Sequence, residues 1–417
     1  MVDLIANSSW SSARGVTAPA LDGAKVIIVL AELELGGAER QALLLAEYLR
    51  RQQGAQVEVW ALSGRPGRVS EICEERGIPW RIVQVPWFVS AREKVRGLMA
   101  LTWALRHARP DVILPYLIIE NVACGLVWRW TGARACIWNQ RDYGLGRLGQ
   151  RAERLAVSRT PWFISNSDHS AKFLIETLGA PAERVRVIHN GVELPPPQSD
   201  RAAWRDRLGL SDETFVACMV ANLTGYKDHD TLLKAWRHVI NNTANAGRSA
   251  VLLLAGRLDS LDSTHHQTKA LAYDLELGKS VRFLGQVQDV SGVLNASDLA
   301  VFSSRSESSP NGVLESMAAG LAVVGTDIPG LQAAVGAAGL EFLAPPGDDE
   351  ALADRILLLQ MDPTLRAKLG AENRLLIRRE FSSQQMCERT LEVIRSALGV
   401  VPNRARTDAR ATENVPA

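Results

Sequence analysis

The 417-residue chain lacks a cysteine framework, a long hydrophobic run and a strong net charge. It contains no C-x-x-C pair, and its cysteines stand singly, at Cys73, Cys124, Cys136, Cys218 and Cys387. This spacing favours reduced thiols over disulfides or a zinc site. The longest apolar stretch, from Val112 to Trp130, is interrupted by Glu120, Asn121 and Arg129. We therefore expect no transmembrane helix.

Both ends of the chain have a composition typical of disordered segments. Residues 1–24 have no basic start followed by an apolar core, so we expect a disordered lead and no signal peptide. Residues 399–417 are charged and contain proline, which indicates a disordered tail. The net charge of +1 gives no reason to expect a nucleic-acid partner. The length and the hydrophobic content of 47% fit two globular domains.

The stretch SSRSESSPNGVLESMAAG, residues 303–320, lies between two short apolar runs at 299–302 and 321–324. Each run has the length and composition of a buried strand. Within the stretch, Ser309 suits a helix N-cap, Pro310 suits the first helical position, and the final glycine suits the helix end. The sequence therefore predicts strand, loop, helix and strand, with a ligand site at the carboxyl end of the first strand.

Two carboxylates and three backbone amides mark this loop as a candidate donor site. Glu307 lies in the loop and Glu315 on the helix, with seven residues between them. The N–H groups of Asn311, Gly312 and Val313 fall in the first helical turn, where unpaired donors and the helix dipole favour a phosphate. Carboxylates suit sugar hydroxyls, and a nucleotide sugar has hydroxyls at both ends with phosphates between. On spacing alone, two solvated glutamates are the favoured interpretation.

The segment Asp298–Gly330 resembles the donor signature of the retaining glycosyltransferases of family 4. Their hallmark E-x7-E motif is matched by Glu307 and Glu315, and the resemblance extends from about Lys25 to Leu398. It implies that Glu307 contacts the donor sugar and Glu315 the ribose hydroxyls. It also implies an α/β protein of the GT-B fold, with two Rossmann-like domains facing across a cleft.

The expected domain division follows the composition and this resemblance. It comprises an acceptor-side domain at 25–194, a linker at 195–200 that contains three consecutive prolines, a nucleotide-sugar domain at 201–381, and a helix at 382–398 that crosses back to the first domain. Alternating elements independently indicate a parallel α/β class. Strands are predicted at 25–30, 57–62, 81–85, 111–119, 135–138, 162–165, 186–188, 215–220, 251–255 and 281–285, and helices include 41–51, 90–107, 168–177, 230–240, 289–296 and 349–360.

The first strand leads into Gly36-Gly37, which permits a tight turn before a helix. The surrounding GGAER sequence is not G-x-G-x-x-G, so a dinucleotide site is poorly supported. A turn without ligand contact remains an open alternative. In family 4 the similar loop faces the cleft, and the resemblance makes both glycines donor-site candidates.

The loop after the predicted strand 215–220 departs from the family pattern. Family 4 members usually carry an Arg and, five residues later, a Lys that neutralise the donor diphosphate. Lys227 matches the Lys, but the Arg position holds Asn222. Leaving-group stabilisation is therefore expected from Lys227 with backbone amides, or from an Arg elsewhere. Asp228-His229-Asp230 resembles a metal motif, but helix capping explains it better, so no metal cofactor is expected.

Several further positions follow from the resemblance alone. It places the nucleobase near Phe283 and Leu284, with Gly256 at the donor site, and it assigns Asn121 and Arg141 to the acceptor side. Many relatives carry a His between positions 115 and 120, and this chain has none. The chain looks closer to a subgroup that builds polysaccharide and lipid-linked oligosaccharide.

Residues 87–107 combine three aromatic residues, Trp87, Phe88 and Trp103, with a basic, amphipathic helical pattern. Between 81 and 160 the chain has 13 Lys or Arg and 5 Asp or Glu. Such a stretch suits an anionic membrane surface, and a packing helix with a solvated basic face is the alternative. We expect a cytoplasmic protein with peripheral contact at the inner face of the membrane.

The interpretation that unites these features is a retaining glycosyltransferase. It would move a sugar, of hexosyl type, from a nucleotide sugar to a glycan or lipid-linked acceptor in cell-surface polysaccharide synthesis. Lys227 would stabilise the leaving diphosphate and Glu307 would orient the donor sugar. Two alternatives remain open: a non-hydrolysing nucleotide-sugar 2-epimerase, and a catalytically silent partner subunit.

Overall fold

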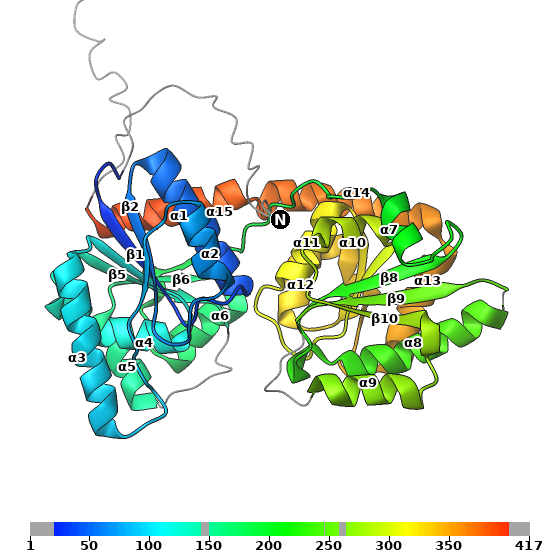
Figure 1. Cartoon of the computed structure of the whole chain (residues 1–417), viewed down its shortest axis with the longest axis horizontal. Coiled ribbons are helices and arrows are strands. Elements are labelled where there is room, and N and C mark those ends of the chain that lie inside the picture. The colour runs from blue at the N-terminus through cyan, green and yellow to red at the C-terminus, as the bar shows by residue number, and fades with distance from the viewer. Residues whose placement is uncertain (1–20, 143–149, 246, 258–263, 400–417) are drawn as a thin grey trace, which may run out of the picture.

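The computed structural model describes residues 21–142, 150–245, 247–257 and 264–399. These residues form two domains that lie side by side, each with a parallel sheet covered by helices (Figure 1). Parallel strands connected by helices are buried on both faces, and this explains their continuous apolar runs. The predicted α/β class with two Rossmann-like domains is confirmed.

The first sheet has seven parallel strands in the order β3-β2-β1-β4-β5-β6-β7. Its strands are β1 (Lys25–Leu30), β2 (Gln56–Ala61), β3 (Trp80–Ile82), β4 (Val112–Pro115), β5 (Ala135–Gln140), β6 (Trp162–Ser165) and β7 (Val185–Val187). Side chains of β1 alternate between two buried clusters. Val26, Ile28 and Leu30 belong to one of these clusters, and Ile27 and Val29 belong to the other.

The second sheet has six parallel strands in the order β10-β9-β8-β11-β12-β13. They are β8 (Phe215–Val220), β9 (Ala250–Ala255), β10 (Val281–Gly285), β11 (Leu299–Phe302), β12 (Ala322–Thr326) and β13 (Leu343–Ala344). Strand β8 lies between β9 and β11. The loops that follow these three strands therefore emerge at one edge of the sheet.

The helices alternate with the strands along the chain. In the first domain they include α1 (Gly37–Gln53), α2 (Arg68–Glu75), α3 (Ala91–Ala108), α4 (Ile118–Val127), α5 (Gln150–Arg159) and α6 (Asp168–Lys172). In the second domain they include α7 (Arg201–Arg207), α8 (His229–Asn245), α9 (Thr264–Asp274), α10 (Val290–Ala296), α11 (Asn311–Ala319), α12 (Pro329–Gly339), α13 (Asp349–Met361) and α14 (Pro363–Glu380).

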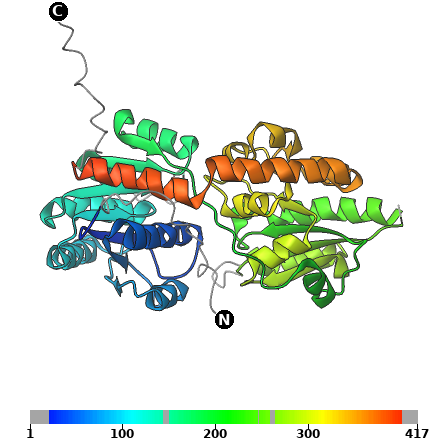
Figure 2. The ribbon, with the colours of Figure 1, turned by 90° about the horizontal axis from the view of Figure 1, so that it is seen from above.

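Helix α15 (Ser383–Ala397) joins the two domains by crossing back over the first (Figure 2). Ser382 caps its start, and the backbone of Ser382 forms a parallel bridge with that of Val192. Met386, Cys387 and Ile394 are buried in the cluster that also contains the apolar face of α1. The last helix thus completes the core of the first domain.

The predicted strand at 111–119 is too long. Strand β4 ends at Pro115, which has no N–H to donate to a neighbouring strand, and Leu117 adopts a φ of 70° before α4 begins at Ile118. The predicted lead is also too long, because Leu21 is buried and its N–H donates to the Gln53 carbonyl. Residues 1–20 and 400–417 lie outside the described residues.

All five cysteines lie among the described residues, where they are buried and unpaired, so the expectation of free thiols is confirmed. Within the described part of the chain, no helix is both long and apolar enough to cross a membrane.

Candidate functional site

A cavity of about 730 Å³ lies between the two domains. Its wall is formed by residues that follow the carboxyl ends of parallel strands in both sheets, including the loop after β1, the β8 loop and the loop between β11 and α11. Ligands of α/β proteins bind at such edges, and the volume falls in the usual range for small-molecule sites.

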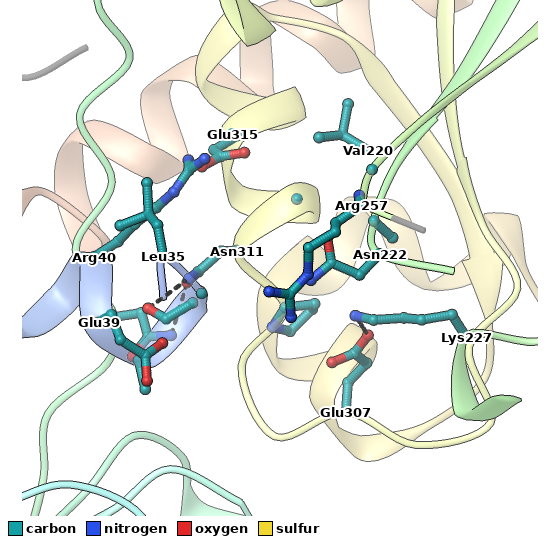
Figure 3. Close-up of a pocket in the computed structure, with 18 of the residues that line it drawn as sticks. Leu35, Glu39, Arg40, Val220, Asn222, Lys227, Arg257, Glu307, Asn311 and Glu315 are labelled. Atoms are coloured by element: carbon teal, nitrogen blue, oxygen red, sulfur yellow. Dashed lines mark hydrogen bonds and ion pairs between the residues drawn. The ribbon is translucent and has the colours of Figure 1, made fainter. Parts of the chain in front are cut away.

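The loop between β11 and α11 brings Glu307 to this wall. The Glu307 carboxylate forms an ion pair with the Lys227 ammonium and accepts a hydrogen bond of 3.0 Å from the Ser304 hydroxyl (Figure 3). The two side chains predicted to act in catalysis therefore meet, although 80 residues separate them in the chain. In this arrangement each neutralises the charge of the other.

The start of α11 differs from the prediction by one residue. Pro310 occupies the N-cap position, and the helix begins at Asn311, so Ser309 is not the cap. The Val313 N–H donates to the Pro310 carbonyl at 3.1 Å, and the Val313 side chain is fully buried. The prediction that Val313 offers a free amide to a phosphate is therefore wrong. Asn311 and Gly312 do line the cavity.

Glu315 lies one helical turn further along α11 and also lines the cavity. Its carboxylate accepts a hydrogen bond of 2.6 Å from the Arg40 guanidinium, which belongs to α1 of the first domain. A second cavity of about 350 Å³ is also bordered by both side chains. The pair therefore connects the domains at the candidate ribose position.

Three of the candidate glycines allow close packing around the site. A Cβ on Gly312 would lie 2.2 Å from the Val220 carbonyl oxygen, and a Cβ on Gly256 would lie 1.9 Å from that of Ala221. A Cβ on Gly37 would lie 2.8 Å from the Asn311 amide nitrogen. Gly36, Gly37, Gly256 and Gly312 all line the cavity. Glycine is needed at these positions because a side chain would collide with a neighbouring part of the protein.

The acceptor-side candidates have different environments. Arg141 lines the cavity, donates to the Asn190 side chain at 2.9 Å and lies over the Tyr116 ring. Burial lowers the pKa of Arg141. Asn121 is fully buried, and its amide exchanges hydrogen bonds with the Asn139 backbone. The assignment of Asn121 to an acceptor site is wrong in this structure, because its side chain instead fixes α4 to β5.

The cavity wall near β10 also differs from the expectation. Phe283 and Leu284 are half-buried and pack against the core of the second domain, and neither lines the cavity. Gln286, Val287 and Gln288, which follow the strand, line it instead. The residues at this strand end that line the cavity therefore lie a few positions further along the chain than Phe283 and Leu284.

Hydrogen bonds between the domains hold the donor loop against the first domain. The Ser308 hydroxyl lies 2.5 Å from the Asn166 side chain and 2.6 Å from the Ser170 hydroxyl. The Asn190 amide donates to the Asn311 side chain at 2.8 Å. These contacts couple the position of the donor loop to the relative position of the domains.

The Asp228-His229-Asp230 sequence has the expected structural role. The Asp228 carboxylate accepts from the Thr231 N–H and hydroxyl at the start of α8 and forms an ion pair with Arg305. Among the described residues, no group of three or more His, Cys, Asp or Glu is placed to hold a metal ion.

Sequence reasoning missed several cavity residues, among them Arg40 and Arg257. Arg40 stands in the quoted GGAER loop, but nothing local predicts its contact with Glu315. Arg257 directly follows β9, the neighbour of β8. The absence of an arginine at position 222 indicates that a cation could come from the end of the adjacent strand, β9.

Two family models match adjoining parts of the chain. Residues 35–194 match "Glycosyltransferase Family 4", and residues 200–375 match "Glycosyl transferases group 1". Together they cover most of both described domains. The chain belongs to the GT-B glycosyltransferases of the family 4 and group 1 type.

Named relatives of this GT-B glycosyltransferase match parts of it. The D-inositol 3-phosphate glycosyltransferase 1 of Catenulispora acidiphila is 29% identical over 252 residues, which cover 59% of this chain and 60% of the relative. A GDP-mannose-dependent phosphatidylinositol monomannoside mannosyltransferase of Corynebacterium glutamicum is 29% identical over 48% of this chain and 52% of its own length. The matches thus span about half to three fifths of these relatives.

Solved structures share the fold over most of the chain. HepE of Anabaena, in complex with UDP and glucose, has a TM-score of 0.77 and 20% identity, covering 89% of this chain and 100% of that chain. A glycosyltransferase of Rickettsia africae has a TM-score of 0.75 and 17% identity, covering 90% of this chain and 99% of its own. At such identities the likeness shows the fold alone.

Proposed function

We propose that this protein transfers a sugar from a nucleotide-sugar donor to a glycan or lipid-linked acceptor, with retention of the anomeric configuration, in cell-surface polysaccharide synthesis. The observation that carries the proposal is the convergence of Glu307, Lys227, Glu315 and the start of α11 on one interdomain cavity. Carboxylates for hydroxyls and cationic or amide groups for phosphates are combined there, as a nucleotide sugar requires.

Each group has a chemical role in this proposal. Lys227 and the first amides of α11 stabilise the negative charge that develops on the departing diphosphate. Glu307 orients the donor sugar and shields the positive charge that develops at its anomeric carbon. No nucleophile is assigned. We place the acceptor on the same face as the leaving phosphate, which takes the acceptor proton.

The names of similar proteins give independent support for this donor class. HepE was solved with UDP-glucose as well as with UDP and glucose, and the Corynebacterium relative is named as GDP-mannose-dependent. These names refer to different bases and sugars. We therefore leave the donor base and sugar of this protein to experiment.

A panel of nucleotide sugars tests the proposal. A donor present at 100 times its dissociation constant should stabilise the protein by roughly 2.7 kcal/mol in thermal unfolding. Incubation with that donor and a lipid-linked glycan should yield a new α- or β-linkage of unchanged configuration. An epimer formed from the donor alone would favour the 2-epimerase, and donor binding without any turnover would favour a silent subunit.

We expect transfer to proceed without a metal ion. The described residues offer no three-carboxylate or histidine cluster for one, and Lys227 supplies positive charge at the proposed diphosphate position. Activity should therefore be unchanged after treatment with excess EDTA, as measured by product formation. Complete loss in EDTA with recovery on addition of manganese would contradict this prediction.

We also propose that helix α3 and its flanks contact a membrane peripherally. Phe88, Val95, Met99 and Trp103 form an exposed apolar stripe, the last three at four-residue spacing, and Phe88, Met99 and Trp103 are 82%, 67% and 65% exposed. Trp130 lies beside it, since the Arg106 guanidinium donates to the Trp130 carbonyl. The helix lies at the outer side of the first domain, away from the second (Figure 1).

Basic side chains border the stripe and set the salt dependence of the expected binding. Arg92 and Arg96 are exposed and Lys94 is partly exposed. The protein should sediment with vesicles that contain anionic lipid, and less so as salt rises, because exposed charges are screened over about 8 Å at physiological ionic strength. Exchanging the three residues for Glu should abolish sedimentation. A control on another surface exchanges exposed Arg378 and Arg379 of α14 for Glu. Equal sedimentation of both variants would mean that α3 is an ordinary packing helix with a solvated basic face.

A further inference from the structure

Cationic side chains around the cavity differ in whether they already have a partner. Within the described residues, the Arg257 guanidinium has no hydrogen-bond acceptor or ion-pair partner, although it lines the cavity. The other cations on the wall are Arg40, paired with Glu315; Arg68, paired with Glu71 and Glu75; Arg141, bonded to Asn190; and Lys227, paired with Glu307. Among the described wall residues, no carboxylate neutralises Arg141 or Arg257, and of these two only the Arg257 guanidinium makes no hydrogen bond. Arg257 is therefore the cation that is freest to bind a ligand.

The backbone of Arg257 is fixed against the loop that carries Lys227. The Arg257 N–H donates to the Asn222 side-chain oxygen at 3.0 Å, and the Arg257 carbonyl accepts from the Leu223 N–H at 3.1 Å. The preceding Gly256 allows this contact, because a Cβ there would lie 1.9 Å from the Ala221 carbonyl oxygen. Asn222 thus holds in place the residue that carries the charge.

The side chain of Arg257 points into the cavity that Lys227, Glu307 and Asn311 line (Figure 3). The positive charge of Arg257 also acts on a carboxyl group of the first domain. Burial raises the pKa of Glu39 on α1, and the positive charge of Arg257 opposes that rise. The guanidinium therefore lies within electrostatic range of both domains.

Charge balance indicates what occupies this position. A diphosphate carries at least two negative charges, and the Lys227–Glu307 pair has no net charge. We infer that Arg257 binds the donor diphosphate and stabilises it as it departs, supplying from the β9 loop the charge that position 222 lacks. The planar guanidinium donates paired hydrogen bonds that match phosphate oxygens. This inference rests on the proposed function.

Binding of nucleoside diphosphates tests the assignment. UDP, GDP, ADP and dTDP are titrated calorimetrically, each beside its nucleoside. For the diphosphate that binds the wild type, Arg257→Ala should weaken affinity about ten- to a hundredfold, because a hydrogen bond to a charged group is lost. Affinity for the nucleoside should not change. Arg257→Lys should lose less than Arg257→Ala, and Arg237→Ala on α8, outside the cavity wall, should resemble the wild type.

Moving the charge gives a second, independent readout. The double variant Asn222→Arg/Arg257→Ala should recover much of the diphosphate affinity, and of kcat for transfer, that Arg257→Ala loses. A purely structural role would not be rescued in this way. If the wild type binds a diphosphate and Arg257→Ala binds it equally well, the inference is overturned while the proposed function stands. If the wild type binds none of the four diphosphates, the proposed function fails, and the inference fails with it.

Discussion

Replacing Lys227 with alanine is expected to lower kcat and kcat/KM together, by at least about a hundredfold. In the proposed reaction the Lys227 ammonium faces charge that grows as the diphosphate departs, so its contribution would be larger in the transition state than in the ground state. The structure adds a second reason. Without Lys227, the Glu307 carboxylate loses its ion-pair partner and presents an uncompensated negative charge to the leaving group. Steady-state kinetics with varied donor measure the effect.

Glu315→Gln provides a matched contrast at the same site. In the proposed function, Glu315 accepts hydrogen bonds from ribose hydroxyls in both ground and transition states, so its loss should raise the donor KM more than it lowers kcat. The expected loss in affinity is roughly ten- to a hundredfold. Lys234→Ala, an exposed lysine of α8 outside the cavity wall, is the control. If Lys227→Ala raised only KM, Lys227 would be a binding residue and another group would carry the leaving charge.

The sequence predicts those parts of the fold that depend on local pattern. The bounds of β1, β6, β8 and β10 agree with the prediction residue for residue, because each is a short run made mostly of apolar residues. The loop between β11 and α11 could also be placed, since Gly320 adopts the left-handed conformation expected of a helix terminus.

Contacts between distant segments could not be predicted in the same way. Arg40 and Glu315 are 275 positions apart, and only the packing of the two domains brings them together. Asn121 and Arg141 both lie near strand ends, but one side chain turns to a neighbouring backbone and the other to the cavity. Side-chain direction of this kind depends on packing that residue type does not specify.

The position of Arg257 depends on strand order. The chain order does not state that β9 lies beside β8, so the sequence alone does not place Arg257 next to the Lys227 loop. Once the order is known, both loops must emerge at the same sheet edge. A missing charge in one loop can then be sought in the other.

Glu120→Gln is expected to change how stability depends on pH, with little effect at low pH. Burial raises the pKa of Glu120 to about 8, and the carboxylates of Glu39 and Asp142 add to the rise, while a backbone hydrogen bond opposes it. Its side chain is almost fully buried in the first turn of α4. The cost of burying an unpaired charge therefore exceeds the favourable helix dipole.

The sign of the effect follows from proton binding. Between the ordinary glutamate value and about 8, the folded state holds a proton on Glu120 that the unfolded state has lost. The free energy of unfolding should therefore fall as pH rises through this range, by about 1.4 kcal/mol per unit. His229 acts in the opposite direction at lower pH, because burial and the charge of Lys227 lower its pKa to about 4. The contribution of His229 to stability therefore increases as the pH rises from about 4 to 6.5, the ordinary pKa of histidine.

The range from pH 6.5 to 8 consequently isolates the carboxyl group. Chemical denaturation of the wild type should show a free energy of unfolding that falls by roughly 1.6 kcal/mol more over this range than in Glu120→Gln, since the group is half ionised at the upper end. The amide cannot ionise, and every other titrating group is common to both proteins, so the difference belongs to Glu120. Glu71→Gln, at an exposed position on α2, should keep the wild-type slope. Parallel slopes for the wild type and Glu120→Gln would mean that the folded protein holds Glu120 ionised, with a cationic or hydrogen-bonding partner strong enough to overcome its burial.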